Sequence, residues 1–314
     1  MVNELRWPGV CADKVASRWK VFGRSVRGAA HERRGLPNQD AICWRPRSGV
    51  GSTLALALAD GHGSPRYARS HIGAHLAVET ATQLIQDFVA GHQDANNLSV
   101  IKRTAEEWLP QALLRSWLDA VNAHARAHPL SEVELQALSL KEDLAMLNAG
   151  NPLIAYGTTL IAVAVAEAFV IYLQLGDGEV LTVTNQSQVG RPLGKDERLF
   201  ANETTSLCAP EAWRDFRVAF QPTAHARPAL ILLTTDGYPN SFRDESGFLQ
   251  AGSDIFKTIQ AEGFSRVKAG LEGWLKDSTS RGSGDDVTIG ILCSMASRKA
   301  TKSVRSSRTR SRKR

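Results

Sequence analysis

The stretch LALALADGHGSPRY (residues 54–67) is an apolar run that ends in Asp60-Gly61-His62-Gly63. The near-continuous apolarity of residues 53–59 predicts a β-strand that is buried on both faces or lies in a sandwich core. Ser64 suits an N-cap and Pro65 suits the first helical position, so we expect a helix from there to about residue 90. A buried strand thus ends by presenting a carboxylate, a flexible backbone and an imidazole. This combination fits a plain turn, a metal site or a catalytic loop.

The rest of the chain alternates between strand and helix patterns. Further strands are expected at residues 19–30, 39–45, 158–167, 169–175, 179–184, 215–220, 229–235 and 287–293, and helices within 91–150 and 254–276. Gly176-Asp177-Gly178 is a turn sequence between two consecutive strands, and the polar residues 185–213 predict a surface flap. This order predicts a single α+β domain with two antiparallel sheets flanked by helices.

Composition narrows the class of protein. No window reaches 18 consecutive apolar residues, and the N-terminus has no apolar signal region, so neither a membrane span nor a secretory signal is expected. The four cysteines are scattered and form no CxxC pair. Scattered cysteines favour reduced thiols over a disulfide framework or a zinc site, which predicts a cytoplasmic protein.

The positive charge of the chain is concentrated at its C-terminal end. Residues 298–314 hold nine of the 38 Lys and Arg residues and no acid, so the remainder carries 29 basic against 32 acidic residues. We therefore expect an N-terminal extension (1–18), one domain (19–296) and a basic disordered tail (297–314). The tail is either a solvated extension or an electrostatic arm for nucleic acid, acidic lipid or an acidic partner.

Carboxylates recur where apolar strands meet glycine turns. Asp60, Asp177, Asp236 and Asp285 (or its neighbour Asp286) follow this pattern, and Asp40 stands just before another strand. A single Asp-Gly is an ordinary turn. If all these strand ends converge, however, the mutual repulsion of the carboxylates would raise their pKa values unless cations neutralised them. Oxygen ligands without a Cys or His cluster suit Mg²⁺ or Mn²⁺.

With these pieces in order, the sequence resembles the metal-dependent (type 2C) Ser/Thr protein phosphatases, especially their bacterial branch. The matching pieces are GLPNQDA (35–41), ALADGHG (57–63), GTTLIAVAV (157–165), LGDGEV (175–180), LLTTDGY (232–238) and GSGDDVTIGIL (282–292). The resemblance implies a four-layer α-β-β-α sandwich with a binuclear Mg²⁺ or Mn²⁺ site at one end.

The resemblance also implies a role for each carboxylate. Asp60 would bridge two metals, and Gly61 would bind one of them through its carbonyl oxygen. Asp236 and Asp285 would hold the second metal, with Asp286 as the alternative to Asp285. Asp40 would hold metal-bound water, and Asp177 matches the position of a third, weaker ion.

His62 matches the proposed general acid of the family. A water between two metals would attack phosphorus in line, and an imidazole could protonate the leaving Ser or Thr alkoxide. The implied partners are phosphorylated protein substrates and a cognate Ser/Thr kinase, and we expect a monomer. A plain surface histidine in a turn is the alternative for His62.

Three positions depart from the family pattern. Gln39 stands where members often have Glu, and Asn240 stands where many have another Asp, which predicts weaker binding of the second and third ions. Gly35 occupies the usual position of the arginine that grips the substrate phosphate. Arg33 and Arg34 are the nearest substitutes, with His31 as a rival.

Two other functions compete with a metal-dependent phosphatase. The departures at Gln39, Gly35 and Asn240 suit a phosphatase-like binding or regulatory module with weak catalysis. The basic tail suits a phosphohydrolase that acts on nucleic acid or nucleotides.

Overall fold

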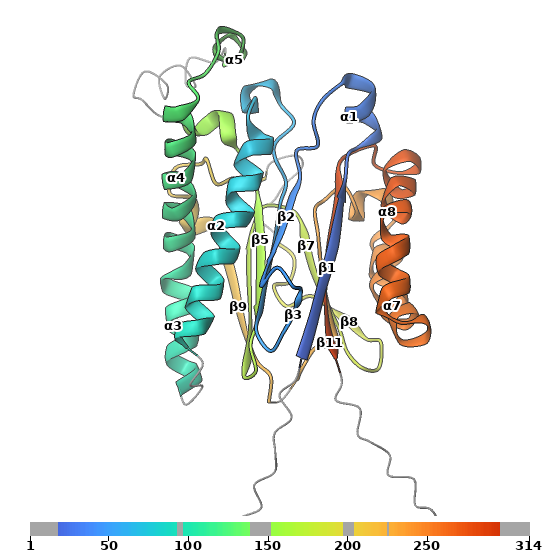
Figure 1. Cartoon of the computed structure of the whole chain (residues 1–314). Coiled ribbons are helices and arrows are strands. Elements are labelled where there is room, and N and C mark those ends of the chain that lie inside the picture. Colours follow the sequence, from blue (N-terminus) through green and yellow to red (C-terminus); the bar gives the residue numbers. More distant parts are fainter. Residues whose placement is uncertain (1–17, 93–96, 139–151, 197–203, 225, 296–314) are drawn as a thin grey trace, which may run out of the picture.

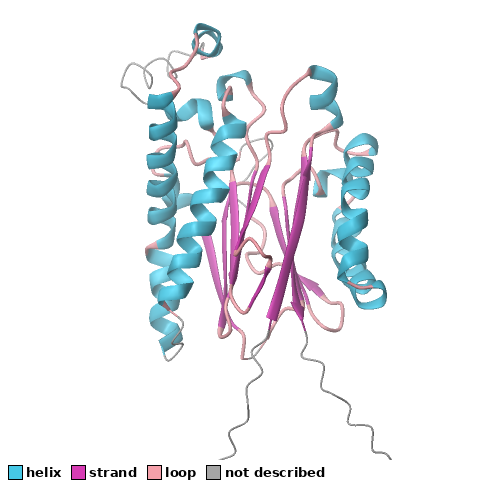
Figure 2. Cartoon of the chain, viewed as in Figure 1, coloured by secondary structure: helices cyan, strands magenta, loops and turns pink. Residues whose placement is uncertain are grey.

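The computed structural model describes residues 18–92, 97–138, 152–196, 204–224 and 226–295. Two antiparallel sheets face each other, and each is covered on its outer face by helices (Figures 1 and 2). This is the predicted four-layer α-β-β-α sandwich. The order of strands within each sheet brings several loops to one edge of the molecule, where the candidate site lies.

The first sheet has five strands in the order β2-β4-β5-β6-β9. Their bounds are β2 (Ala41–Arg45), β4 (Leu54–Ala59), β5 (Leu160–Val165), β6 (Phe169–Leu175) and β9 (Arg217–Pro222). The second sheet has the order β3-β1-β11-β10-β7-β8. Its strands are β3 (Val50–Gly51), β1 (Arg18–Val26), β11 (Val287–Met295), β10 (Leu230–Thr234), β7 (Glu179–Val183) and β8 (Val189–Gly190).

The alternation of β4 explains why this apolar strand is buried on both faces. Leu54, Leu56 and Leu58 pack between the two sheets, whereas Ala55, Ala57 and Ala59 face the helices. Successive strand residues point to opposite faces, so the large side chains fill the space between the sheets. The small alanines let a helix approach closely on the other face.

Helices cover the two outer faces. The five-stranded sheet packs against α2 (Ser70–Gly91), with α3 (Leu98–Glu107) and α4 (Leu109–Ala127) beside it, while α7 (Glu245–Glu262) and α8 (Phe264–Arg281) cover the other sheet (Figure 1). Two short helices complete the described part, α1 (Ala29–Arg34) and α5 (Glu132–Ala137). Short 3₁₀ turns are found at Pro65–Tyr67, Pro152–Tyr156, Ala212–Asp215 and Pro239–Ser241.

The helix expected from residue 64 begins later. Pro65–Tyr67 form only a 3₁₀ turn, Ser64 makes no capping hydrogen bond through its side chain, and α2 starts at Ser70. The buried side chain of Arg69 makes contacts with distant residues that fix this start. The strand expected at residues 19–30 ends at Val26, and residues 29–34 form helix α1 instead.

The segment 254–276 is not one helix. It contains the end of α7 and the larger part of α8, which meet at Gly263. Gly263 has a φ of +89°, a conformation that suits glycine and ends α7 after Glu262. The apolar periodicity continues across this break, which hid it from the sequence pattern. Trp108, Trp117 and Trp274 lie on apolar helix faces in the sequence pattern, which predicts that they belong to the core; Trp117 is buried, but Trp108 and Trp274 are 47% and 41% exposed.

The turn Gly176-Asp177-Gly178 does not close a hairpin. β6 belongs to the five-stranded sheet and β7 to the six-stranded sheet, so this turn carries the chain from one sheet to the other. Gly176 has a φ of +105°, which permits the sharp change of direction. Asp177 is thereby placed at the edge between the two sheets.

Parts of the domain plan stay predictions. Outside the described residues lie 1–17 of the expected extension (1–18), residue 296 with the whole expected tail (297–314), part of the flap (197–203), and residues 93–96 and 139–151 in and just after the helical segment. Within the residues described, no helix has the length and apolarity needed to cross a membrane.

Candidate metal centre

The carboxylates singled out in the sequence meet at one edge of the sandwich. Ala41, the first residue of β2, pairs with Ala59, the last residue of β4. Asp40, just before β2, therefore lies next to Asp60, just after β4. Thr234 pairs with Glu179 across β10 and β7, which brings Asp236 close to Asp177. The predicted convergence of the strand ends is therefore found.

Asp40 is buried and held at one oxygen. Its Oδ2 accepts hydrogen bonds from the hydroxyls of Thr235 (2.7 Å) and Thr288 (2.6 Å). Its Oδ1 is buried and has no hydrogen-bond partner. Burial raises the pKa of Asp40 well above its ordinary value, and the charges of Asp286 and Asp236 raise it further.

Asp60 is fixed through its backbone. Its N–H donates to Thr159 Oγ1 (3.0 Å), and its carbonyl oxygen accepts from Thr159 N–H (2.8 Å) and Thr158 Oγ1 (2.8 Å). A Cβ on Gly61 would lie 2.8 Å from the carbonyl oxygens of Gln39 and Ser70, so glycine is required there. The backbone of Asp60 is thus held by Thr158 and Thr159, just before β5.

Charge at this edge is concentrated and of one sign. Burial raises the pKa of Asp60 well above normal, with contributions from Asp40 and Asp236, and it raises the pKa of Asp236 to about 6. The carboxyl groups of Asp60 and Asp236 lie close enough for each to affect the pKa of the other. No described Lys or Arg forms an ion pair with Asp40, Asp60 or Asp236. Carboxylates in this arrangement lack a counter-charge.

The donor set fits a hard divalent cation. The available groups are carboxylate oxygens, including the unpaired Oδ1 of Asp40, and Gln39 Oε1, which is buried without a hydrogen-bond partner. Among the described residues, no three Asp, Glu, His or Cys side chains already surround one cation position.

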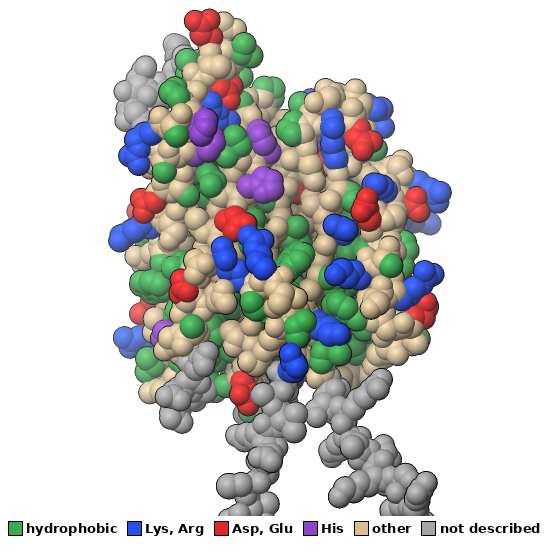
Figure 3. Space-filling view, viewed as in Figure 1, with side chains coloured by type: hydrophobic (Ala, Val, Ile, Leu, Met, Phe, Trp, Pro, Cys, Tyr) green, Lys and Arg blue, Asp and Glu red, His purple; other side chains and the backbone are tan. Residues whose placement is uncertain are grey.

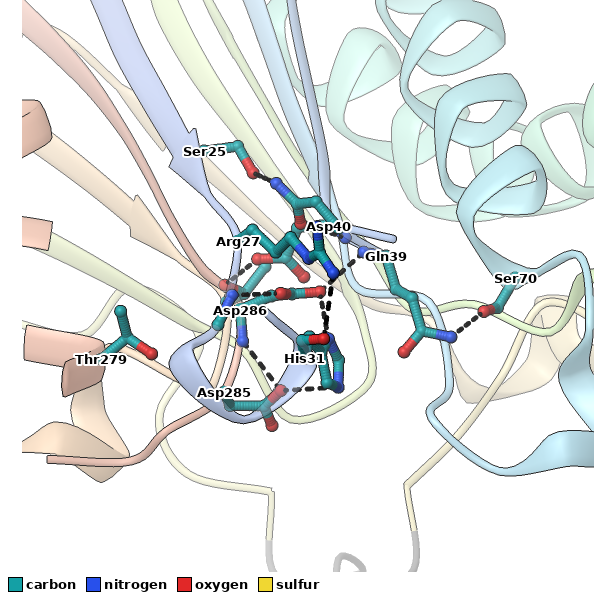
Figure 4. Close-up of polar contacts among 12 residues, drawn as sticks. Ser25, Arg27, His31, Gln39, Asp40, Ser70, Thr279, Asp285 and Asp286 are labelled. Atoms are coloured by element: carbon teal, nitrogen blue, oxygen red, sulfur yellow. Dashed lines mark hydrogen bonds and ion pairs between the residues drawn. The ribbon is translucent and has the colours of Figure 1, made fainter. Parts of the chain in front are cut away.

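Asp285 and Asp286 have different environments (Figure 4). Asp285 is exposed at the mouth of the site, and its charge contributes to the raised pKa of Asp236. Asp286 is buried, and both of its oxygens accept backbone hydrogen bonds, from Gly28 N–H and Gln39 N–H. Asp285 is thus the more accessible of the two carboxylates, although its Oδ1 accepts a hydrogen bond from Asp286 N–H (2.8 Å).

Gln39 and Asn240 use their amides within the protein. Gln39 Nε2 donates to Ser70 Oγ (2.8 Å) and to the carbonyl oxygen of His62 (3.2 Å), and Asn240 Nδ2 donates to Asp236 Oδ2 (3.1 Å). Gln39 thereby fixes the loop that carries His62 and keeps only its neutral Oε1 for a ligand.

His62 stands at the opening beside an aromatic ring. Its imidazole lies 4.7 Å from the ring of Tyr67, centroid to centroid. Burial lowers the pKa of His62 to about 4, and the charge of Arg66 acts in the same direction. The imidazole is therefore neutral at pH 7 in the protein alone.

The predicted phosphate-binding arginines lie apart from this network. Arg33 and Arg34 are exposed on α1. Their rival His31 is buried, with Nδ1 2.9 Å from Asp286 Oδ2 and Nε2 3.7 Å from Asp285 Oδ1. Arg27, which the sequence did not suggest, lies beside His31 in Figure 4, and its Nη2 donates to the carbonyl oxygen of His31 (3.0 Å).

Basic and acidic side chains are intermingled on the face drawn in Figure 3, where the coloured residues form no single basic patch. The basic tail lies outside the described residues, so its proposed role in binding nucleic acid stays a prediction. His71 and His75 share a helix face but join no group of three metal-binding side chains among the residues described.

The threonines of the site were missed by sequence reasoning. Thr158, Thr159, Thr235 and Thr288 hold Asp60 and Asp40 in place. Thr235 and Thr288 stand within two residues of an Asp in the pieces TTDG and GDDVT, whereas Thr158 and Thr159 in GTTL have no Asp near them in the sequence. A threonine beside a strand-end Asp was therefore an available signal for the first two but not for the second two.

Comparisons with known proteins agree with this geometry. The sequence profile of protein phosphatase 2C matches residues 27–276. PppA, described as a key regulatory component of the type VI secretion system in Pseudomonas aeruginosa, has a similar fold with a TM-score of 0.53. Its sequence is 17% identical, and the match covers 88% of this chain and 98% of PppA. A bacterial serine phosphatase has a TM-score of 0.51 at 15% identity, covering 87% and 96% of the two chains.

No curated protein sequence matches the chain. The two structural likenesses show the fold, and the family profile extends over most of the sequence, including Asp40, Asp60 and Asp236. The chain belongs to the protein phosphatase 2C family.

Proposed function

We propose that this protein is a divalent-cation-dependent phosphatase that hydrolyses phosphoserine and phosphothreonine in proteins. The observation that carries the proposal is the set of carboxylates at the strand ends, which lie close together without a basic counter-charge. Such a group destabilises the fold unless cations bind, and two or more Mg²⁺ or Mn²⁺ ions would bind through oxygen ligands of this kind.

The proposed ligands follow from the resemblance of the sequence pieces to the family. Asp60, with the carbonyl of Gly61, would be shared between two ions, and Asp236 and Asp285 would hold the second. Asp40 would orient water through its unpaired Oδ1, and Gln39 Oε1 would add a weak neutral ligand. Asp177, at the crossing between the sheets, would take part in a third, weaker site.

The bound cations would supply a water that is nucleophilic at neutral pH and would offset charge on the phosphoryl oxygens. His62 would then donate a proton to the departing Ser or Thr oxygen. Its low pKa in the protein alone would rise when a phosphate dianion is bound nearby, because negative charge stabilises the imidazolium. Arg33 or Arg34 would contact the phosphate by moving over the mouth from α1.

The substrates would be phosphorylated proteins, and a Ser/Thr kinase that phosphorylates them would be the functional counterpart. The test uses a phosphothreonine peptide with the purified full chain and Mn²⁺. We expect release of phosphate that EDTA abolishes and that Asp60→Asn abolishes. Asp87→Asn, which changes an exposed carboxylate on α2, is the matched control and should retain activity. Activity that persists in EDTA or in Asp60→Asn contradicts the proposal.

A second candidate is a phosphatase-like binding module with weak catalysis. The observation that favours it is the neutral Gln39, whose amide nitrogen is committed to Ser70 and to the loop of His62. Calorimetry with Mn²⁺ separates the two candidates. Binding at two sites together with turnover supports the enzyme, whereas no binding at millimolar Mn²⁺ supports the module.

A further inference from the structure

Asp286 is a buried carboxylate to which the proposed reaction assigns no role. Its side chain is 3% exposed, and it accepts hydrogen bonds from Gly28 N–H at Oδ1 (2.6 Å) and Gln39 N–H at Oδ2 (2.6 Å). His31 Nδ1 lies 2.9 Å from the same Oδ2. These partners lie more than 240 residues away in sequence, so Asp286 ties the loop after β1 to the start of β11 (Figure 4).

The main chain of Asp286 is equally constrained. A Cβ on Gly237 would lie 2.0 Å from the carbonyl oxygen of Asp286, and a Cβ on Gly28 would lie 2.4 Å from the carbonyl carbon of Asp285. Gly28 and Gly237 therefore allow two other loops to pack directly on the main chain of residues 285 and 286. The position of Asp286 is fixed from both sides.

Three neighbours of Asp286 are, or stand next to, a candidate ligand. Gln39 precedes Asp40, Gly237 follows Asp236, and Asp285 is the chain neighbour itself. The fourth candidate ligand, Asp60, is connected to Asp286 indirectly through Gln39. The residue after Asp60 is Gly61, and its N–H donates to the carbonyl oxygen of Gln39 (3.1 Å). Four carboxylates from four separate loops are thus connected to one buried residue, through its side chain at Gln39 and through its main chain at Gly237 and Asp285.

We propose that Asp286 is a positioning residue that sets the spacing of Asp40, Asp60, Asp236 and Asp285 for cation binding, with His31 as its third partner. This inference rests on the proposed function in taking the four carboxylates as cation ligands. Residues that orient metal ligands without touching the metal typically change metal affinity by about 10- to 100-fold when they are replaced.

The chemistry of the contact requires a carboxylate. Asp286 offers an acceptor oxygen to each of two backbone N–H groups. An asparagine offers one acceptor oxygen, and its amide nitrogen would face a second donor. Asp286→Asn therefore removes one of the two hydrogen bonds from backbone N–H groups but keeps the shape of the side chain. Asp286→Glu keeps the charge and both oxygens but extends the side chain by one methylene, so that it no longer fits between both N–H groups.

The test measures Mn²⁺ dissociation constants of the full chain by calorimetry, and the thermal midpoint of the metal-free protein. We expect both Asp286→Asn and Asp286→Glu to weaken Mn²⁺ binding by at least about tenfold. Asp244→Asn is the matched control, because Asp244 also accepts a backbone N–H (from Gly247, 3.0 Å) but caps α7 on the exposed surface. It should bind Mn²⁺ as the wild type does.

The two Asp286 variants separate position from charge. If Asp286→Glu binds like the wild type and only Asp286→Asn is weak, the negative charge alone matters and the positioning role is overturned. A lower thermal midpoint with unchanged Mn²⁺ affinity overturns it as well. Should either variant not fold, His31→Asn removes the third contact and is expected to weaken Mn²⁺ binding, and unchanged affinity in that variant overturns the proposal.

The outcome also separates this inference from the proposed function. Wild-type protein that binds Mn²⁺ but releases no phosphate contradicts the phosphatase and leaves the positioning role supported if the Asp286 variants bind weakly. Wild-type protein that binds no Mn²⁺ at millimolar concentration overturns both.

Discussion

Two places in this molecule bury charge, and they do so in opposite ways. At the start of α2, the guanidinium of Arg69 is buried beside Glu134, and its pKa is raised chiefly by the hydrogen bond to that carboxylate. At the strand-end edge, Asp40, Asp60 and Asp236 lie among one another, and burial raises their pKa values. The first cluster is neutralised within the chain and the second is not.

The Arg69 cluster is complete in its hydrogen bonds. Arg69 Nε and Nη2 donate to both oxygens of Glu134 (2.6 and 2.9 Å), Nη2 donates to the carbonyl oxygen of Pro129 (2.9 Å), and Nη1 donates to the hydroxyl of Tyr156 (2.8 Å) and the carbonyl oxygen of His128. The hydrogen bond from Arg69 is also the main reason that the pKa of Glu134 is lowered to about 2. A buried charge whose donors are all paired has a structural role, because it connects the elements that supply its partners.

The difference teaches how function can be recognised in a fold. Satisfied buried charge stabilises connections between elements, here between α2 and α5, whereas unsatisfied buried charge persists only where a ligand completes it. The predictions below test whether the two clusters respond to change in these opposite ways.

The largest effect is expected for Asp60→Asn. Loss of the ligand shared between two cations should reduce phosphatase activity by about 1,000-fold or more, because metal-ion catalysis contributes several kcal/mol. The same change removes an uncompensated carboxylate, so the metal-free variant should melt at a higher temperature than the metal-free wild type. Calorimetric melting without metal checks this. A lower melting temperature would mean that the cluster is not electrostatically strained.

Arg69→Met should have the opposite effect on stability. It leaves Glu134 without its partner and removes the links to Pro129 and Tyr156, so we expect a loss of about 3 to 5 kcal/mol in the free energy of unfolding. Urea denaturation of the full chain measures it. The double variant Arg69→Met/Glu134→Gln should recover part of this loss, since no unpaired charge remains. A loss below about 1 kcal/mol for the single variant would mean that Arg69 contributes no more to the free energy of unfolding than an ordinary surface residue does.

His62→Asn should lower kcat on a phosphothreonine peptide by about 100-fold, within the usual range for loss of a general acid. The loss should be much smaller with p-nitrophenyl phosphate, because its leaving group needs no proton. Steady-state kinetics with both substrates provides the measurement. Equal losses on the two substrates would assign His62 a role other than proton donation.

The contribution of Asp236 to the stability of the metal-free protein should depend on pH in a direction opposite to that of His62. Asp236 has a pKa raised to about 6, so at this group the folded state binds more protons than the unfolded state between about pH 4 and 6. Asp236 should therefore contribute about 2 kcal/mol more to stability at pH 4 than at pH 7, whereas His62, with a pKa lowered to about 4, destabilises the fold as the pH falls through the same range. Urea titrations of the wild type and of Asp236→Asn isolate the first contribution, since the stability difference between the two should change in this direction with pH. Saturating Mn²⁺ should reverse the trend, because cations bind the ionised form.

Much of the fold was predictable because it depends on local alternation. The LALALA and LIAVAV runs specify buried strands, and each candidate ligand stands at the end of such a strand. The break at Gly263 was missed because the apolar pattern continues across it. The crossing at Gly176–Gly178 was missed because a turn sequence does not say which sheet the next strand joins.

The site was predictable in its ligands but not in what holds them. Strand-end carboxylates are visible in the sequence, whereas the partners of Asp286 and of Asp40 come from segments 195 to 258 residues away. Such contacts exist only after the two sheets are packed. The start of α2 at Ser70 instead of Ser64 has the same cause, since the long-range bonds of Arg69 override a local helix signal.

The smallest effect is expected where charge is paired at the surface. Glu79 accepts hydrogen bonds from Arg45 (3.2 Å) and Arg47 (2.5 Å), with nearly half of its side chain exposed. Water screens such pairs, so Glu79→Gln should change the free energy of unfolding by less than about 1 kcal/mol and leave Mn²⁺ affinity unchanged. Geometrically this cluster resembles Arg69–Glu134, with one carboxylate between donors, and burial is the main difference. A loss of 3 kcal/mol in Glu79→Gln would show that pairing alone, without burial, accounts for the contribution assigned to Arg69.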